Sequence, residues 1–177
     1  MAPGQEVTIS YGHQDTEQSL FTFGFALDTV NSVITSPLSL EAEDSEVRSA
    51  LLRLLMLDRH GAAGAVSQLA YAKLHWNRKT SAVDVSELYA AANILVAQED
   101  DLKDYVQLVA KLGHLPAGVY EHVSVEAQEK LQDVLTAWSI HLQQDAASSR
   151  RQDLDALCRY KRDCRSAVKA ALKKLQA

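Results

Sequence analysis

The feature that most constrains this chain is the helical spacing of its apolar residues from about residue 45 to the end. Apolar side chains recur there at steps of three and four residues in one segment after another, with short polar connections between segments. Such spacing places the apolar residues of each segment on one face of a helix. Successive amphipathic helices with short connections are typical of a helical bundle. The first apolar face consists of Val47, Ala50, Leu51, Leu54 and Leu55.

Local signals divide this region into elements. Asp84 followed three residues later by Glu87 has the form of a capping box, and Gln98 to Asp101 forms a turn that can cap the next helix. Gly113 stands where a helix-ending glycine belongs, and Ser124 can cap a longer helix. In chain order we expect helices over residues 45–56, 65–76 (a weaker one), 84–96, 102–112, 124–142 and 150–175, with a polar loop over 77–83 and an interruption over 143–149.

The segment 1–40 follows a different pattern. Val7 and Ile9 alternate with polar residues and lead to Tyr11-Gly12, which predicts a short strand that ends in a tyrosine and a turn. A short aromatic helix is expected from about Asp15 onward. Residues 33–38 read as a second extended segment that ends near Pro37. Without other information, a strand and helix of this kind are more often packing elements than catalytic ones.

The string Gly4-Gln5-Glu6-Val7-Thr8-Ile9-Ser10-Tyr11-Gly12, followed by Phe23-Gly24-Phe25, resembles the C-terminal end of a SET methyltransferase domain. It is most similar to the group typified by the Rubisco large-subunit lysine methyltransferase. The resemblance implies that Tyr11 stands beside the target amine as the catalytic tyrosine. It also implies that Phe23, Gly24 and Phe25 wall the channel for the substrate side chain. Such a tyrosine hydroxyl orients a neutral amine for in-line attack on a methyl group.

The chain departs from that family in two ways. Phe23 replaces the tyrosine that usually stands in the Tyr-Gly-Phe motif, which removes one hydroxyl from the channel. The family's cofactor-binding elements, a glycine-rich strand and an Asn-His motif, would precede Gly4. We therefore expect no cofactor-binding residues in this chain, and no binding of S-adenosylmethionine by the chain alone. Lysine is the expected target of the complete enzyme, and histidine is the alternative.

The helical region extends the resemblance, because in this family an all-helical substrate-binding domain follows the SET domain. Ala156 to Arg162 is similar to a pattern in the last helix of that domain. We place the boundary near residues 38–44, with the incomplete SET end over 1–40 and the substrate-binding-like domain over 41–177. The expected fold class is mainly α, a helical bundle preceded by a short β/α remnant. The alternative is a non-catalytic helical module that binds a protein and keeps a vestigial SET tail.

Charge and composition narrow the expected partners. The net charge is −5, yet residues 150–177 hold nine lysines and arginines, so an acidic protein or nucleic acid could bind this end. The more common interpretation of such a segment is a solvated helix face whose cations suit the helix C-terminus. Without interleaved aromatic residues, nucleic acid is not expected. We expect a monomer that binds a protein substrate, without a membrane span, signal peptide or metal site. Cys158 and Cys164 fall on different helix faces, which favours free thiols in an intracellular protein of undetermined compartment.

Overall fold

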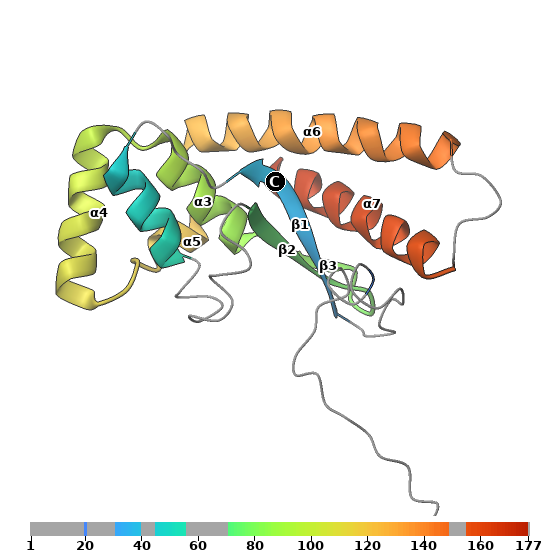
Figure 1. Ribbon diagram of the computed structural model, residues 1–177, viewed down its shortest axis with the longest axis horizontal. Helices are drawn as coiled ribbons and strands as arrows, with labels where there is room; N and C mark the ends of the chain where they lie inside the picture. The colour runs from blue at the N-terminus through green and yellow to red at the C-terminus, as the bar shows by residue number, and fades with distance from the viewer. Residues whose placement is uncertain (1–19, 21–30, 40–44, 56–70, 149–154, 177) are drawn as a thin grey trace, which may run out of the picture.

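A computed structural model describes residues 20, 31–39, 45–55, 71–148 and 155–176 of the chain. These residues form a small sheet and a set of helices (Figure 1). The class is mainly α with a short β part, as the sequence predicts. The expected opening strand lies outside the described residues, and so does the expected aromatic helix apart from Leu20, which is helical and buried. The labelled elements are β1 (Asn31–Ser39), β2 (Tyr71–Asn77), β3 (Ala82–Asp84), α3 (Ser86–Val96), α4 (Glu99–Leu112), α5 (Gly118–Glu121), α6 (Val125–Ser148) and α7 (Asp155–Leu175), and residues 46–55 are also helical.

The sheet is antiparallel, with strand order β1-β2-β3. β1 pairs with β2 from Asn31 opposite Asn77 to Thr35 opposite Lys73, and the register shifts before Ser39. β1 and β2 thus lie on opposite sides of the boundary expected near residues 38–44 and pair with each other. The division into residues 1–40 and 41–177 stays a prediction.

The strand β2 corrects the sequence analysis, which predicted a helix over residues 65–76. Ala72, Leu74 and Trp76 alternate along β2, and all three are buried in the core. A period of two residues suits a strand with one face on the core. The expected polar loop over 77–83 is a tight turn that leads into β3. In that turn the Asn77 side-chain oxygen accepts the Thr80 N–H at 3.0 Å, and Ser81 takes a positive φ of 53°.

The helix α3 lies at the centre of the molecule. Every residue from Glu87 to Ile94 is buried, because α5, α6 and β2 all pack against this helix. Its last carbonyls are covered by the 46–55 helix, where Arg48 donates to the carbonyl oxygens of Ile94 (3.1 Å) and Ala97 (2.8 Å). Cationic donors suit this position because the carbonyls at a helix C-terminus carry partial negative charge. Arg48 therefore replaces the glycine cap that α3 lacks.

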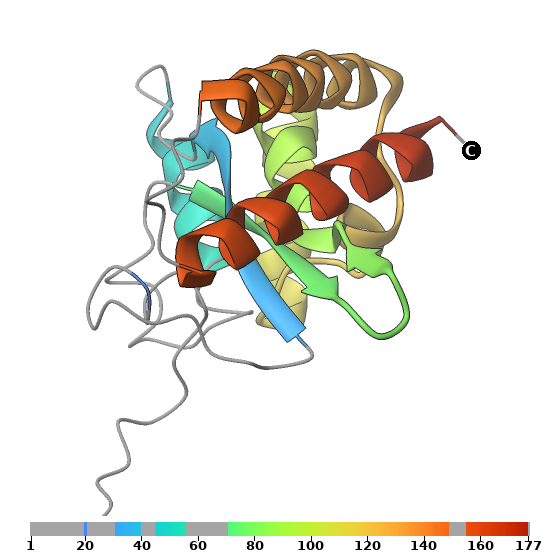
Figure 2. The same cartoon turned by 90° about the vertical axis from the view of Figure 1, so that its right-hand side faces the viewer.

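The helices α6 and α7 form an antiparallel pair that packs beside the sheet (Figures 1 and 2). Ser124 caps α6 as predicted, because its Oγ accepts the Ala127 N–H at 3.2 Å. At the same end, the Gln128 side chain donates to the Leu175 carbonyl oxygen at 2.6 Å. α6 continues to Ser148, past the interruption that the sequence predicted to begin at residue 143. α6 covers α3 on one side, and α7 packs against β2 and β3.

The helix α4 matches its predicted caps and is the least covered of the longer helices. The Gln98 N–H donates to the Asp101 carboxylate at 3.3 Å, and Gly113 ends the helix with a φ of 80°. Leu102 is its only buried residue. Within the described ranges, no helix is both long and apolar enough to cross a bilayer.

Candidate functional site

The site residues implied by the resemblance, Tyr11, Phe23, Gly24 and Phe25, all lie outside the described residues. Their placement, and with it the geometry of the expected substrate channel, stays a prediction. The described residues can therefore contribute two things to a site: the elements that follow that segment in the chain, and the surfaces that a partner could contact. Three places bear on this: the β1 strand, a polar cluster at the start of α3, and the exposed face of α4.

The strand β1 is the first extended element after the SET-like stretch. Five residues, 26–30, separate Phe25 from its first residue, Asn31. β1 is hydrogen-bonded along β2, and the Ile34 side chain is fully buried in the core. A strand pinned by both a ladder and a buried side chain has a fixed position relative to the helices. The chain that follows the SET-like stretch therefore enters a well-packed unit within a few residues.

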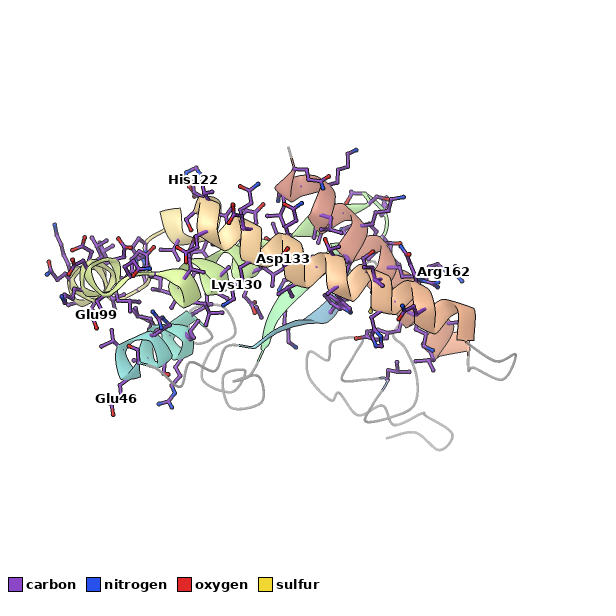
Figure 3. The ribbon with its side chains drawn as sticks, turned by 90° about the horizontal axis from the view of Figure 1, so that it is seen from above. Glu46, Glu99, His122, Lys130, Asp133 and Arg162 are labelled. Atoms are coloured by element: carbon purple, nitrogen blue, oxygen red, sulfur yellow. The ribbon has the colours of Figure 1, made fainter. Side chains whose placement is uncertain are left out.

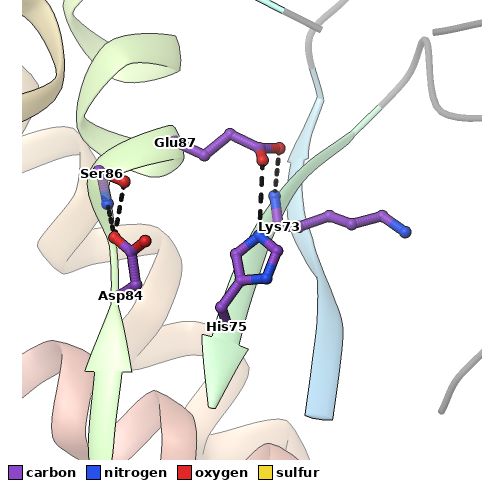
Figure 4. Close-up of polar contacts among 5 residues, drawn as sticks. All are labelled: Lys73, His75, Asp84, Ser86 and Glu87. Carbon is purple, nitrogen blue, oxygen red and sulfur yellow. Dashed lines mark hydrogen bonds and ion pairs between the residues drawn. The ribbon is translucent and has the colours of Figure 1, made fainter. Parts of the chain in front are cut away.

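The polar cluster joins β2, β3 and α3 (Figure 4). Glu87 is 2% exposed, and its carboxylate accepts the backbone N–H of Lys73 at 2.7 Å. His75 Nε2 lies 3.9 Å from the other Glu87 oxygen, so a protonated imidazole would form an ion pair with this carboxylate. A buried carboxylate needs such partners, because an unpaired charge in the interior is costly.

The same cluster corrects the predicted capping box. Asp84 accepts both the backbone N–H (2.9 Å) and the hydroxyl (2.6 Å) of Ser86, and the helix begins at Ser86 with Val85 as its N-cap. Glu87, the expected second half of the box, reaches strand β2 instead. The pattern of contacts is that of a structural clamp between the sheet and the first turn of α3. The carboxylates of Glu87 and Asp84 accept hydrogen bonds from backbone N–H groups. The role of this cluster is therefore to position α3.

The exposed face of α4 carries apolar side chains. Val106 is 43% exposed, but it lies about 120° or more around the helix from the exposed Leu108 and Leu112. These two leucines are one turn apart and 39% and 46% exposed, and we call them the α4 apolar surface. Beside them Tyr105 is half-buried. Burial raises the pKa of the Tyr105 phenol, and the carboxylate of Asp101, one turn earlier, raises it further. The phenol therefore stays neutral at physiological pH and can both donate and accept a hydrogen bond.

The sequence analysis missed this surface because it expected the helix over 102–112, which carries Leu108, Val109 and Leu112, to bury its apolar face in a bundle. Val109 is half-buried, but its two neighbours on that face are exposed. Apolar residues on a surface helix can mark a contact with another protein. No local signal distinguishes an apolar face that a neighbouring helix covers from one that it leaves open.

Metal and thiol chemistry have no support in the described part of the chain. No group of three or more histidine, cysteine, aspartate or glutamate side chains gathers there in a way that could hold a metal ion. Neither Cys158 nor Cys164 is in a disulfide bond; Cys164 is buried and Cys158 is exposed, in agreement with their predicted placement on different helix faces. No family model matches the sequence, and no curated protein matches it.

Proposed function

We propose that this chain is the C-terminal part of a SET-type protein methyltransferase. In this proposal residues 1–40 supply the segment that carries the active-site Tyr11, and residues 41–177 form the domain that binds the protein substrate. The resemblance of residues 4–25 to the end of a SET domain is the observation that carries the proposal. The arrangement of β1 is consistent with it, because β1 is held against β2 directly after that stretch.

The helical domain would act as a rigid platform beside the tyrosine segment. The Glu87 clamp on β2 and the Arg48 cap on α3 fix the elements that surround the sheet. The α4 apolar surface then provides side chains that a substrate protein could cover. Binding energy from such remote contacts helps to hold a side chain at the reacting centre.

S-adenosylmethionine belongs to this proposal only for the complete protein. The family's glycine-rich strand and Asn-His motif would precede Gly4, and the described residues supply neither. The described residues therefore do not fit the cofactor on their own, and no reaction step is assigned to them. The proposed reaction of the complete protein is methyl transfer to a side-chain nitrogen of a protein substrate, with lysine as the expected acceptor.

The test begins with the native protein, captured from its source cells with an antibody against the helical region. Its intact mass is compared with the mass of this chain, 19.5 kDa. The captured protein is then incubated with tritiated S-adenosylmethionine and protein fractions from the same cells. We expect a larger mass and transfer of label to a protein. A mass equal to that of this chain, without transfer, would overturn the proposal.

Two variants of the expressed full-length protein sharpen the test. Tyr11→Phe removes the hydroxyl that is proposed to orient the amine, and it should abolish transfer of label. Tyr105→Phe makes the same chemical change at a half-buried tyrosine of α4 and should leave kcat unchanged. Equal rates for Tyr11→Phe and the unaltered protein would contradict the assignment of Tyr11.

A second candidate is a helical module that binds a protein without catalysing a reaction. The observation that favours it is the α4 apolar surface, since Leu108 and Leu112 are exposed one turn apart on the same helix. This candidate predicts that the captured protein has the mass of this chain alone and retains a bound protein. It also predicts that Leu112→Glu releases this partner, whereas Gln107→Glu, at an exposed polar position of the same helix, retains it.

A further inference from the structure

The helix α7 carries a row of exposed cations. Arg162, Arg165, Lys169 and Lys173 follow one another at steps of three, four and four residues, and all four are exposed. At about 100° per residue, their positions fall within about 80° of one another, and the row is about 16 Å long. We call these four residues the α7 basic stripe.

The stripe lies on the side of α7 that faces away from the core. The opposite side of the helix is buried against α6 and the sheet. It consists of Cys164, Ala167, Val168, Ala171 and Leu175. Because the core fixes this side, the direction in which the stripe points is fixed as well.

The acid nearest to the stripe in sequence is turned away from it. Asp163 is buried and forms an ion pair with Arg78 from the turn between β2 and β3. Among the described residues, no carboxylate pairs with any of the four stripe cations. Arg165 instead donates to the carbonyl oxygen of Lys161 in its own helix, at 3.3 Å.

Many of the exposed acids lie at the other end of the molecule, although α6, which packs against α7, also carries exposed acids at Glu126, Glu129 and Asp133. Figure 3 places Arg162 at one end and Glu46 and Glu99 at the opposite end. The first two turns of α4 add further exposed acids, Asp100, Asp101 and Asp104. Among the described residues, none of these acids forms an ion pair with a stripe cation, and exposed charges farther apart than about 8–10 Å are largely screened at physiological salt.

An acidic polypeptide fits this stripe better than nucleic acid or a membrane does. Nucleic-acid affinity grows with the number of phosphates neutralised, and here four cations stand on a protein with net charge −5. Tyr160, the one aromatic residue of α7, is half-buried, which leaves no stacking platform for bases. The apolar face of α7 is buried in the protein, so the helix cannot lie in a bilayer interface.

We infer that the α7 basic stripe binds an acidic segment of the protein substrate. The inference rests on the proposed function, because it names the class of substrate that the helical domain recruits. Contacts between exposed charges are individually weak. The stripe therefore speeds the encounter and sets which proteins are recruited, and it leaves the chemical step to the tyrosine segment.

Direct binding tests this inference without any methyl transfer. The probe is a fluorescent dodecapeptide of alternating Glu and Gly, titrated with the purified chain at low and physiological ionic strength. We compare R162Q/K169Q with K103Q/K111Q, which removes two exposed cations from α4 and changes the net charge equally. The stripe variant should bind about fivefold more weakly at low salt. The α4 variant should bind within a factor of two of the unaltered chain.

Two results would overturn the inference. One is equal weakening by both variants, which would mean that only net charge matters. The other is tighter, stripe-dependent binding of a single-stranded dT dodecamer or of phosphatidylserine vesicles, which would assign the stripe to another class of partner. Stripe-dependent peptide binding supports the inference about partner class even where the methylation test fails, and the acidic protein is then a partner instead of a substrate.

Discussion

Arg78 and Asp163 form a two-point ion pair that ties the turn between β2 and β3 to α7. Arg78 Nε lies 3.0 Å and 2.8 Å from the two carboxylate oxygens of Asp163, and Nη2 donates to one of them as well. The Asp163 side chain is 6% exposed and that of Arg78 is 22% exposed. This pair joins residues 85 positions apart and fixes the helix that carries the basic stripe.

Arg78→Met should lower the free energy of unfolding by about 2 kcal/mol, because it leaves a buried carboxylate without its cation. Lys79→Met, at the exposed neighbouring position, should change it by less than about 0.5 kcal/mol. Urea denaturation of the purified chain measures both values. Adding Asp163→Leu to Arg78→Met should restore part of the loss, since an apolar pair can replace a buried ion pair. Equal effects of Arg78→Met and Lys79→Met would contradict a structural role of the pair.

Asn93 is a buried polar residue that holds α5 and the start of α6 against α3. Its side-chain nitrogen donates to the carbonyl oxygens of Val119 (3.2 Å) and His122 (2.7 Å), and its oxygen accepts the Ser124 N–H at 2.9 Å. Asn93→Leu leaves these three backbone groups without that partner. It should cost about 2–4 kcal/mol. Hydrogen exchange of the Ser124 amide should accelerate, and unchanged exchange would show that another group satisfies this amide.

The sequence predicted the helices better than it predicted the sheet. The caps at Gln98, Gly113 and Ser124 are local signals, and each stands where it was expected. The strand β2 was predicted as a helix although Ala72, Leu74 and Trp76 alternate with polar residues at the period of a strand, because so short a signal does not decide between helix and strand. What decides between them is pairing with β1, which lies far earlier in the chain and which a local pattern cannot contain.

The candidate site was less predictable than the fold. The partner of Glu87 is the Lys73 N–H, 14 residues away on β2, and a local pattern assigned the carboxylate to a capping box instead. The α4 apolar surface was hidden for a similar reason, since the sequence shows an apolar face without showing what covers it. The stripe on α7 was visible as a basic segment. The arrangement of its cations could not be predicted without the structure, which shows that one side of the helix is buried and that Asp163 is paired with Arg78.

The α4 apolar surface should contribute little to folding. Leu108→Glu and Leu112→Glu replace exposed apolar side chains, and each should change the free energy of unfolding by less than about 1 kcal/mol. Leu102→Ala, on the buried side of the same helix, should cost about 2–5 kcal/mol. Thermal or urea denaturation separates the two outcomes. A loss from Leu112→Glu as large as that from Leu102→Ala would show that the surface belongs to the core.

The raised pKa of Tyr105 makes a prediction at alkaline pH. Burial raises this pKa above the usual value of 10.0, and the Asp101 carboxylate adds to the rise. A phenol whose pKa is higher in the folded state contributes stability that is full below pH 10, the unfolded value. This contribution is lost as the pH rises from there through the folded pKa.

Tyr105→Phe should therefore make the free energy of unfolding fall less steeply above pH 10. Asp101→Asn should lower the Tyr105 pKa only part of the way towards 10.0, because burial is the larger cause of the rise. Absorbance at 295 nm follows the phenolate during titration, and full unfolding in urea should bring all the tyrosines to about pH 10. An alkaline titration that Asp101→Asn leaves unchanged would remove the carboxylate as a cause.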